Sequence, residues 1–453
     1  MNKHTHLIGI GGIGMSCIAS LLLRRGVKVS GSDVKESRIT QELKKMGADV
    51  FLGHASGNIT DADLVVYSSA VKEDNPEVIE ARKRGVPIIK RAEALAQLMA
   101  EKTAITVTGS HGKTTTTSLI SCLLLEAGLN PSVAVGGILR NIDTNACFGD
   151  GDYFVAEADE SDGSFLCYEP MYSIITNIDY EHLDYYHTYQ NLVGSFTEFL
   201  NKTKDGGCAF CCNDDVTLMN IMKDYTKRHI VFGLTDSADI YPQNVQMNGL
   251  SSRFDCYYKK KLIDSFYLPL GGTHNISNSL AVIALGLELG INVEIIKRTL
   301  SNFKGAGRRI EIKYNHDDYL VIDDYAHHPT EIKATLAAIR NLKTKRVIAI
   351  FQPHRFTRTQ LLLDEFAKCF DLADYLVITD IYAASEPPIP GISGRSIYEK
   401  IKERSPQKDV VFIPKNGIVM HVLEMLKPGD VVLTLGAGDI TKIGDELVEK
   451  LKG

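Results

Sequence analysis

Residues 105–118, ITVTGSHGKTTTTS, carry the strongest chemical signal in the sequence. An apolar run typical of a strand leads into a glycine-containing turn, after which Gly-Lys-Thr begins a helix. Gly109 and Gly112 would let the turn point its N–H groups at an anion, and the start of the helix would favour negative charge. Lys113 could reach the outer phosphates of a nucleotide, and Thr114 could offer its hydroxyl to Mg²⁺. The segment therefore predicts a nucleoside triphosphate site.

The spacing departs from the most familiar phosphate-binding loop, which would place a glycine at position 107, where this chain has Val107. A capped helix start that binds nothing is the alternative. Capping alone does not account for a lysine directly after Gly112 and four threonines after the lysine. We therefore favour the nucleotide site.

A second glycine pattern lies near the start of the chain. Gly9, Gly11 and Gly14 match G-x-G-x-x-G between a predicted strand and a predicted helix, and Asp33 follows Gly14 by 19 residues. This pattern is typical of sites for pyrophosphate-containing nucleotides, with the carboxylate placed for a ribose hydroxyl. A glycine turn without a ligand is the alternative. A dehydrogenase would need one nucleotide site, whereas this chain predicts two on different domains.

Acidic residues follow two further predicted strands, at the edge of a sheet where α/β proteins bind ligands. Four carboxylates within six residues repel one another unless a cation or Lys113 lies nearby. The alternative for these carboxylates is a solvated loop. The second group also contains His182, for which the alternative is a structural role. The first group is Glu157, Asp159, Glu160 and Asp162, and the second is Asp179, Glu181, His182 and Asp184.

More polar sets lie in the second half of the chain. Two of them end predicted parallel strands, which would let them share a cleft, and arginines there suit carboxylate or phosphate. Each set also has a structural alternative. This is helix capping for Asn275 and Asn278, solvent exposure for Arg308 and Arg309, and packing for the sets that follow the strands. The sets are His274, Asn275 and Asn278; Arg308 and Arg309; Asp323, Asp324, His327 and His328; and His354, Arg355 and Arg358.

Strands that alternate with helices predict parallel sheets covered by helices, and this pattern occurs three times. The 453 residues are enough for about three domains. Residues 231–270 alternate apolar and polar positions and predict an antiparallel excursion, and residues 274–300 predict two helices. We expect an α/β protein with domains at residues 1–98, 99–310 and 311–453.

The composition excludes several classes of protein. Lys and Arg number 50 and Asp and Glu 56, so the net charge of −6 argues against a nucleic-acid-binding protein. No apolar run reaches the about 18 residues that cross a bilayer, and no signal peptide is expected, so we predict a cytoplasmic protein without membrane insertion. Cys208, Cys211 and Cys212 lack a second pair of metal ligands, so packing is the preferred interpretation.

The ordered motifs resemble those of the ATP-dependent Mur ligases nearly from end to end. The G-x-x-G-K-T spacing is the spacing that this family uses. The motifs are GIGGIGMS at 9–16, TGSHGKTTT at 108–116, EADESDGSF at 157–165, TNIDYEHLD at 176–184, HNISNSLA at 274–281, DDYAHHPTE at 323–331, FQPHRFTRT at 351–359, EPPIPGISG at 386–394 and GAGDI at 436–440.

The resemblance implies three domains, each built on a largely parallel sheet. The first would be Rossmann-like and bind the UDP part of a sugar nucleotide, the second would be P-loop-like and bind ATP with Mg²⁺, and the third would be Rossmann-like and close over both. The reaction that the resemblance implies joins L-alanine to the lactyl carboxylate of UDP-N-acetylmuramate, with ADP and phosphate as the other products. The oligomeric state is left open between monomer and homodimer.

The resemblance also implies roles for individual residues. Those expected around the UDP-sugar are Gly11, Gly12, Ile13, Gly14, Ser32, Asp33, His54, Ser69 and Ala70. Those expected around ATP are Gly109, Ser110, His111, Gly112, Lys113, Thr114, Thr115, Asn275, Asn278, Arg309 and Asp324. The expected Mg²⁺ ligands are Thr114, Glu157 and His182, and the expected catalytic residues are Lys113, His182, Arg309, Asp324, His327, His354, Arg355 and Arg358.

Three other functions remain as alternatives. An NAD-dependent dehydrogenase would explain the N-terminal glycines and leave TGSHGKTTT unexplained. A sister ligase, one that recycles a muropeptide or extends folate with glutamate, should differ in its N-terminal and FQPHR-like motifs. A nucleotide sensor without turnover shares every binding motif and is separated only by an assay.

Overall fold

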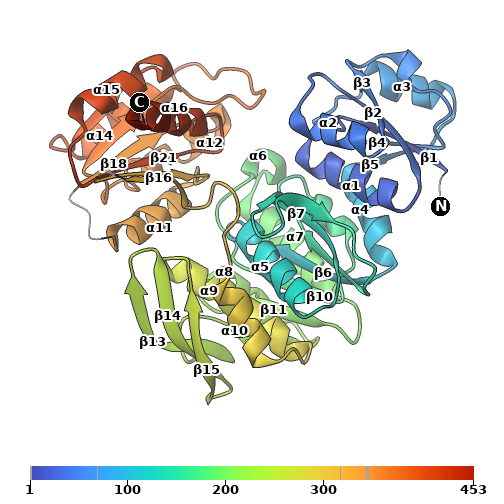
Figure 1. Cartoon of the computed structure of the whole chain (residues 1–453), viewed down its shortest axis with the longest axis horizontal. Helices are drawn as coiled ribbons and strands as arrows, with labels where there is room; N and C mark the ends of the chain where they lie inside the picture. Colours follow the sequence, from blue (N-terminus) through green and yellow to red (C-terminus); the bar gives the residue numbers. More distant parts are fainter. Residues whose placement is uncertain (1–2, 69, 317, 343–345, 453) are drawn as a thin grey trace. The chain divides into compact units, whose positions relative to one another are not determined.

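The computed structural model describes residues 3–68, 70–316, 318–342 and 346–452 (Figure 1). The first part is a parallel sheet of five strands in the order β3-β2-β1-β4-β5. The order reverses between β1 and β4, which places a ligand crevice at the carboxyl ends of these strands. The strands are β1 His4–Ile8, β2 Lys28–Asp33, β3 Asp49–Leu52, β4 Leu64–Tyr67 and β5 Ile88–Lys90.

The helices of this part connect successive strands, as parallel pairing requires. A short loop after β1 begins the first helix, and this helix also contacts the central sheet at β7 and β8. The helices are α1 Ile13–Arg24, α2 Arg38–Lys45, the 3₁₀ turn η1 Ser56–Asn58, α3 Pro76–Lys83 and α4 Arg91–Ala100.

The central sheet has ten strands in the order β15-β14-β13-β12-β11-β10-β6-β9-β7-β8. Strands β6 and β9 to β12 pair in parallel, whereas β7 and β8 form an antiparallel pair. The strands are β6 Thr103–Thr108, β7 Ser132–Leu139, β8 Thr144–Cys147, β9 Tyr153–Glu157, β10 Tyr172–Ile175, β11 Cys208–Cys212, β12 His229–Phe232, β13 Ile240–Asn248, β14 Ser251–Tyr258 and β15 Lys261–Leu268.

Helix α5 (Lys113–Glu126) follows β6, and its residues from Thr115 to Leu124 are all buried. A helix that is buried on every side is held by its surroundings, so the phosphate-binding loop before it has a fixed support. The other helices and turns of this part are η2 Ser164–Cys167, α6 Leu183–Tyr186, α7 Tyr189–Asn201, α8 Val216–Met222, α9 Thr273–Glu288 and α10 Val293–Ser301.

The C-terminal sheet has six strands in the order β16-β17-β21-β18-β19-β20, parallel except for the edge strand β16. Successive residues of the inner strands face opposite sides, so both faces of the sheet are packed: Ile322 and Phe351 belong to one buried cluster, and Val321 and Ile350 to the other. The strands are β16 Glu311–His316, β17 Tyr319–Asp324, β18 Arg346–Phe351, β19 Tyr375–Ile378, β20 Val410–Phe412 and β21 Asp430–Leu435.

Helices cover these two faces. A short 3₁₀ turn, η3 Lys415–Gly417, directly precedes helix α15. The helices are α11 Pro329–Arg340, α12 Phe356–Leu361, α13 Leu363–Phe366, α14 Gly394–Arg404, α15 Ile418–Met425 and α16 Thr441–Lys452.

The predicted α/β architecture with three largely parallel sheets is confirmed. The predicted antiparallel excursion is also present, because β13, β14 and β15 are successive neighbours joined by two-residue loops. The sequence interpretation missed the β7–β8 hairpin and the edge strand β16. No helix among the described residues is both long and apolar enough to cross a membrane.

The three cysteines at 208–212 lie on β11, which sequence reasoning did not identify as a strand. All three are buried and not in disulfides, and burial raises the pKa of Cys208 and Cys212 to about 11. A thiol with a raised pKa is a weak nucleophile and a weak metal ligand. This agrees with the interpretation that the cysteines serve packing.

The contacts between residues divide the chain into two compact units. The first unit ends at Lys304, shortly after helix α10, and the second unit resumes at Gly305, which has a left-handed φ of 83°. The first unit comprises Met1–Gln243, Asp255–Phe266 and Ser277–Lys304, and the second comprises Asn244–Phe254, Tyr267–Ile276 and Gly305–Gly453.

We predict that the Gly-Ala-Gly segment 305–307 is a hinge between the units. If it is, small-angle X-ray scattering should show a smaller radius of gyration when ATP and the UDP-sugar expected from the sequence are both added. ATP and UDP-sugar added separately serve as controls. An unchanged radius with both ligands bound would count against the hinge.

Candidate active site

The phosphate-binding loop connects β6 to α5, and two glycines make its path possible. Gly109 has a φ of 128° and Gly112 a φ of 84°, both in the region that favours glycine. A Cβ atom at Gly109 would lie 2.2 Å from Thr176 Oγ1, and one at Gly112 would lie 2.6 Å from Asn278 Oδ1. The backbone conformation and the lack of space therefore both require glycine at these two positions.

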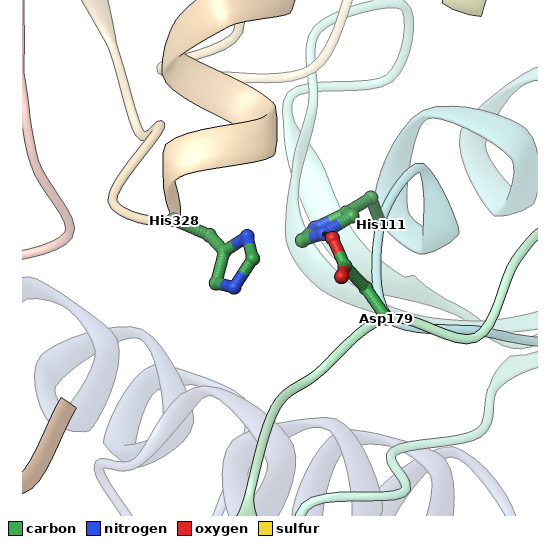
Figure 2. Close-up of side chains that lie close together, drawn as sticks. All are labelled: His111, Asp179 and His328. Carbon is green, nitrogen blue, oxygen red and sulfur yellow. Dashed lines mark hydrogen bonds and ion pairs between the residues drawn. The ribbon is translucent and has the colours of Figure 1, made fainter. Parts of the chain in front are cut away.

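Residues that follow β10 hold the loop in place. The Ser110 hydroxyl accepts a hydrogen bond from the Asp179 N–H at 2.8 Å, and the His111 N–H donates to Asn177 Oδ1 at 2.8 Å. The His111 Nε2 atom also lies 2.9 Å from Asp179 Oδ2 (Figure 2). Figure 2 also draws His328, which caps the start of α11 in the second unit. The hydrogen bonds of Ser110 and His111 with Asn177 and Asp179 fix the conformation of the loop, and they use only some of the N–H groups of the loop.

Lys113 forms the central ion pair of the loop. Its ammonium donates to both carboxylate oxygens of Glu160 at 2.8 Å and to the Gly109 carbonyl at 2.7 Å. Glu160 is fully buried and the Lys113 side chain is 14% exposed. Burial lowers the pKa of Lys113, but the carboxylates of Glu160 and Asp159 outweigh it and raise the pKa above its usual value. Lys113 is thus held charged where a phosphate would enter.

Thr114 and Glu157, two predicted Mg²⁺ ligands, lie side by side. The Thr114 hydroxyl donates to Glu157 Oε1 at 3.1 Å, and the Gly136 N–H donates to Oε2 at 2.9 Å. Burial raises the pKa of Glu157, although Lys113 and these two donors oppose it. A carboxylate whose charge is only partly compensated suits an added cation.

His182, the third predicted ligand, has a left-handed φ of 57° and lies between two carboxylates. Its Nε2 atom is 3.5 Å from Glu160 Oε1 and 3.6 Å from Glu181 Oε2. Burial lowers the pKa of His182, but these neighbours outweigh it and raise the pKa. Glu160, Glu181 and His182 offer ligand atoms within 4.8 Å of one another.

The sequence named Glu160 and Glu181 among the acidic residues, but the resemblance did not select them as ligands. Their burial is what distinguishes them, and burial depends on the folded surroundings. Carboxylate and hydroxyl oxygens are the donors that Mg²⁺ prefers, so the residues around Lys113 fit this ion.

The predicted nucleotide contacts Asn275 and Asn278 lie in the first turns of α9. Asn278 packs against Gly112, and the Asn275 amide donates to the Gly271 carbonyl at 2.8 Å. Thr115 is buried within α5. Asn278 is therefore directly at the phosphate-binding loop, whereas the Asn275 amide bonds to the carbonyl of Gly271, which lies just before its own helix.

The N-terminal glycine loop is built around Asp33. The Gly11 N–H donates to Asp33 Oδ2 at 2.9 Å, and a Cβ atom at Gly11 would lie 2.8 Å from the same oxygen. A Cβ atom at Gly14 would lie 3.0 Å from the Arg91 side chain. The loop is closed tightly against the end of β2, and the role of Asp33 toward a ribose hydroxyl stays a prediction.

The other predicted UDP-sugar residues surround this loop. Gly12 is extended with a φ of −66° and precedes Ile13, the first residue of α1. Ser32 is the next-to-last residue of β2, before Asp33, and its hydroxyl lies 2.9 Å from His54 Nδ1. Ala70 is exposed after β4. The prediction for Ser69 lies outside the described residues.

In the second unit, the two neighbouring arginines differ. Arg308 donates to Asp323 Oδ2 at 2.9 Å and to the carbonyls of Gly436 and Gly438, so it is a structural residue. Arg309 lies over the Tyr325 ring, 5.1 Å from its centre, and 3.6 Å from Glu331. Arg308 lies over the same ring at 5.2 Å, and the role of Arg309 as a nucleotide contact stays a prediction.

Asp324, at the end of β17, is almost completely buried. Its carboxylate accepts from the N–H groups of Ile310 and Ala326 at 2.7 and 2.8 Å. Burial raises its pKa to about 6, although Arg309 and these donors oppose the shift.

The structure brings together residues that follow two different strands, β17 and β18. The rings of His327 and His354 are 5.4 Å apart, and Arg358 lies 3.0 Å from His354 Nδ1. His354 also stacks on Tyr382 at 5.7 Å. Arg355 has a left-handed φ of 69° and lies 4.0 Å from Glu386. The shared location predicted for these two sets is thus found, while their chemical roles stay predictions.

The space at Gly112 gives a matched pair of variants. Gly112 and Gly128 lie at the two ends of α5 and both have positive φ, but a Cβ atom at Gly128 would meet nothing within 4 Å. Both alanine variants should lose about 1–2 kcal/mol of unfolding free energy. Only Gly112→Ala should weaken ATP binding by about tenfold or more, which is about 1.4 kcal/mol, because its Cβ atom presses on Asn278. Calorimetric titration checks this, and equal ATP affinities would refute it.

Asp324 predicts a titration that can be measured directly. The carbon-13 signal of its carboxyl group should show a titration midpoint near pH 6, whereas the ordinary pKa of aspartate is 3.8. Since the folded pKa is above the unfolded value, this group favours the fold when protonated, and that contribution is lost as pH rises from about 4 through about 6.

Arg309→Gln should move the midpoint of Asp324 upward, because Arg309 lowers the pKa of this carboxyl. Carbon-13 NMR with an Asp324→Asn variant for assignment gives the midpoint. Arg340→Gln, on the same unit but paired with Asp374, is the control and should leave it unchanged. A midpoint near 4 in the parent protein would contradict the burial argument.

Comparisons with known proteins place this chain in a family. Its sequence matches models of the Mur ligase family catalytic domain over residues 4–103, the Mur ligase middle domain over 107–286 and the Mur ligase glutamate ligase domain over 308–438. A UDP-N-acetylmuramate–L-alanine ligase from Geotalea uraniireducens is 46% identical over 99% of this chain and 98% of its own length, and one from Desulforapulum autotrophicum is 47% identical over 99% of both chains.

Solved structures agree with the sequence relatives. The UDP-N-acetylmuramate-alanine ligase MurC from Thermotoga maritima has a TM-score of 0.83 and 30% identity, covering 100% of this chain and 99% of that one. A murein peptide ligase from Psychrobacter arcticus, with a TM-score of 0.72, 23% identity and coverage of 99% and 98%, shares the fold. The chain belongs to the Mur ligase family.

Proposed function

We propose that this chain is the ATP-dependent ligase that joins L-alanine to the lactyl carboxylate of UDP-N-acetylmuramate. ADP and phosphate would be the other products, and the reaction would serve the cytoplasmic synthesis of peptidoglycan precursors. The observation that carries the proposal is 46% identity to alanine-adding ligases over 99% of the chain, together with a complete phosphate-binding loop. The alanine-adding relatives span all three parts of the chain, so each part is expected to keep its role.

The chemistry explains why the site needs a phosphate loop. A carboxylate is a poor electrophile, so one of its oxygens first attacks the γ-phosphorus of ATP and ADP leaves. The neutral amine of L-alanine then attacks the acyl phosphate carbon, the amide forms, and phosphate leaves with that oxygen. Phosphoryl transfer depends mainly on positioning and charge neutralisation, and Lys113 supplies a fixed positive charge.

We assign Mg²⁺ to the residues around Lys113. Thr114 and Glu157 would hold the ion beside the phosphates, and His182 would contribute from the segment after β10. The ion would neutralise charge on the phosphates and orient them. The oxygen-rich surroundings and the raised pKa of Glu157 support this assignment.

We propose domain boundaries near residues 98 and 310, at α4 and before β16. The N-terminal domain would bind the UDP-sugar at the crevice beside Gly11 and Asp33. Arg309, at the end of the central domain, and Asp324, in the C-terminal domain, would both contact the nucleotide. His327, His354, Arg355 and Arg358 would surround the amino acid and the transferred phosphate, because arginine and histidine suit both anions.

The proposal is tested by phosphate release from MgATP. We expect release only when UDP-N-acetylmuramate and L-alanine are both present, and little with D-glutamate or without an amino acid. L-serine and glycine define the selectivity. Release with another acceptor, and none with L-alanine, would indicate a sister ligase.

Lys113→Ala gives a second test of the two-site assignment. It should reduce turnover to the background rate, because the charge on the phosphates loses its fixed partner. UDP-sugar affinity should change by less than about twofold, equivalent to about 0.4 kcal/mol, since that site lies on another sheet. If a folded Lys113→Ala variant loses both turnover and UDP-sugar binding, the assignment of two separate sites is wrong.

A further inference from the structure

A buried carboxylate lies behind the proposed UDP-sugar site and takes no part in the chemistry described above. Glu77 is the second residue of α3, and its side chain is fully buried. The Ser32 hydroxyl donates to its Oε2 atom at 2.5 Å, and the Asn58 amide donates to its Oε1 atom at 2.5 Å. His54 Nδ1 lies 3.3 Å from Oε2. The carboxylate thus contacts two of the residues expected around the UDP-sugar.

Glu77 is ionised in this setting. Burial would raise its pKa, but the His6 ring, 3.8 Å away, and the donors Ser32 and Asn58 outweigh burial and lower the pKa. Its place in the first turn of α3 also favours a negative charge. An ionised carboxylate only accepts hydrogen bonds.

The proton count then fixes the state of His54. A serine hydroxyl has one proton, and Ser32 gives it to Glu77. Ser32 can only accept from its other neighbour, His54 Nδ1, which lies 2.9 Å away. Nδ1 must therefore carry a proton, and in the neutral ring Nε2 is left with a lone pair. Nε2 has no recorded partner among the described residues, and the His54 side chain is 21% exposed.

We propose that Glu77 is a positioning residue that holds His54 in the Nδ1–H form, so that Nε2 accepts a hydrogen bond from a donor on the bound nucleotide. The chemical class of that donor is a ribose hydroxyl or the base N–H. The recognition half of this inference rests on the proposed function, because it takes the N-terminal crevice as the nucleotide site. The tautomer half does not.

Glu77→Gln makes a sharp prediction because the neighbouring amide has a fixed orientation. Asn58 Nδ2 also donates to the Gly53 carbonyl at 3.1 Å, so it keeps its N–H groups towards residue 77. The new glutamine must place its oxygen against Asn58 and its NH₂ group against Ser32. Ser32 then accepts from the glutamine and donates to His54 Nδ1. The ring changes to the Nε2–H form, and its acceptor becomes a donor.

Nitrogen-15 NMR of ring-labelled histidine distinguishes the two forms, and a His54→Gln variant identifies the signals among the 13 histidines. We expect Nδ1–H in the parent protein and Nε2–H in Glu77→Gln. Ser32→Ala should keep Nδ1–H, because Glu77 Oε2 remains 3.3 Å from this nitrogen. Glu80→Gln is the matched control on the same helix and should change nothing, since Glu80 pairs with Arg84. An Nε2–H ring in the parent protein would overturn the proposal, even if the Glu77 variant fails to fold.

Binding measurements test the recognition half. UDP should bind Glu77→Gln about three- to tenfold more weakly than the parent protein, the effect of one lost hydrogen bond. Of 2′-deoxy-UDP, 3′-deoxy-UDP and N3-methyl-UDP, the one that lacks the donor should bind the parent protein more weakly by a similar factor. That analogue should show no further loss in Glu77→Gln.

The outcomes separate the two halves. If all three analogues lose equally in both proteins, His54 does not read a donor, and the recognition claim is wrong. If the parent protein does not bind UDP at all, the proposed nucleotide site fails, while the NMR result still decides whether Glu77 sets the tautomer.

Discussion

The ion pair between Lys113 and Glu160 is the interaction on which the phosphate-binding half of the molecule depends. Glu160 is completely buried and Lys113 nearly so. Removing one partner of such a pair would leave a buried charge uncompensated, at a cost of about 3–5 kcal/mol. The pair joins the loop after β6 to the segment after β9, and Glu160 also faces His182 from the segment after β10. One buried carboxylate therefore fixes the relative positions of three segments that approach the phosphates.

The same constraint explains the other sites. Parallel strands end at one edge of each sheet, and charged residues gather there, partly buried and partly compensated. Glu157 receives donors from Thr114 and Gly136, Asp324 from two backbone N–H groups, and Glu77 from Ser32 and Asn58. These hydrogen bonds hold each carboxylate in one orientation. The pKa of each carboxylate depends on the balance between burial and these donors. The pKa is raised for Glu157 and Asp324 and lowered for Glu77.

The two loops that we propose bind nucleotides are physically connected within the first unit. Helix α1, which begins at the N-terminal glycine loop, contacts β7 and β8, and Gly136 of β7 donates to Glu157 beside Thr114. A ligase that transfers a phosphoryl group to a sugar nucleotide needs its two substrates held in register. The packing of α1 on this hairpin supplies a continuous path of contacts between their loops.

Much of this arrangement could be predicted from the sequence, because the decisive signals are local. Gly109 and Gly112 indicated a turn that only glycine allows, and Lys113 and Thr114 come directly after it in the sequence. The alternation of strands and helices indicated three largely parallel sheets. Strands β8 and β16 were missed because they lie at sheet edges, where few residues are buried and the apolar pattern is weak. Strand β7 was missed because two glycines, Gly136 and Gly137, interrupt its apolar run. Glu77 was missed because nothing local distinguishes a buried glutamate at a helix start from an exposed one. The residue types of Arg308 and Arg309 are the same, and the contacts of Arg308 with Asp323 and with the carbonyls of the 436–438 loop appear only in the folded structure.

In the proposed reaction, the phosphate-binding loop serves to activate a carboxylate of the sugar nucleotide. The most direct measurement uses UDP-N-acetylmuramate with oxygen-18 in its lactyl carboxylate and mass analysis of the released phosphate. Transfer through an acyl phosphate predicts one oxygen-18 atom in each phosphate when both carboxylate oxygens are labelled. Phosphate without oxygen-18, formed together with the amide product, would contradict the account.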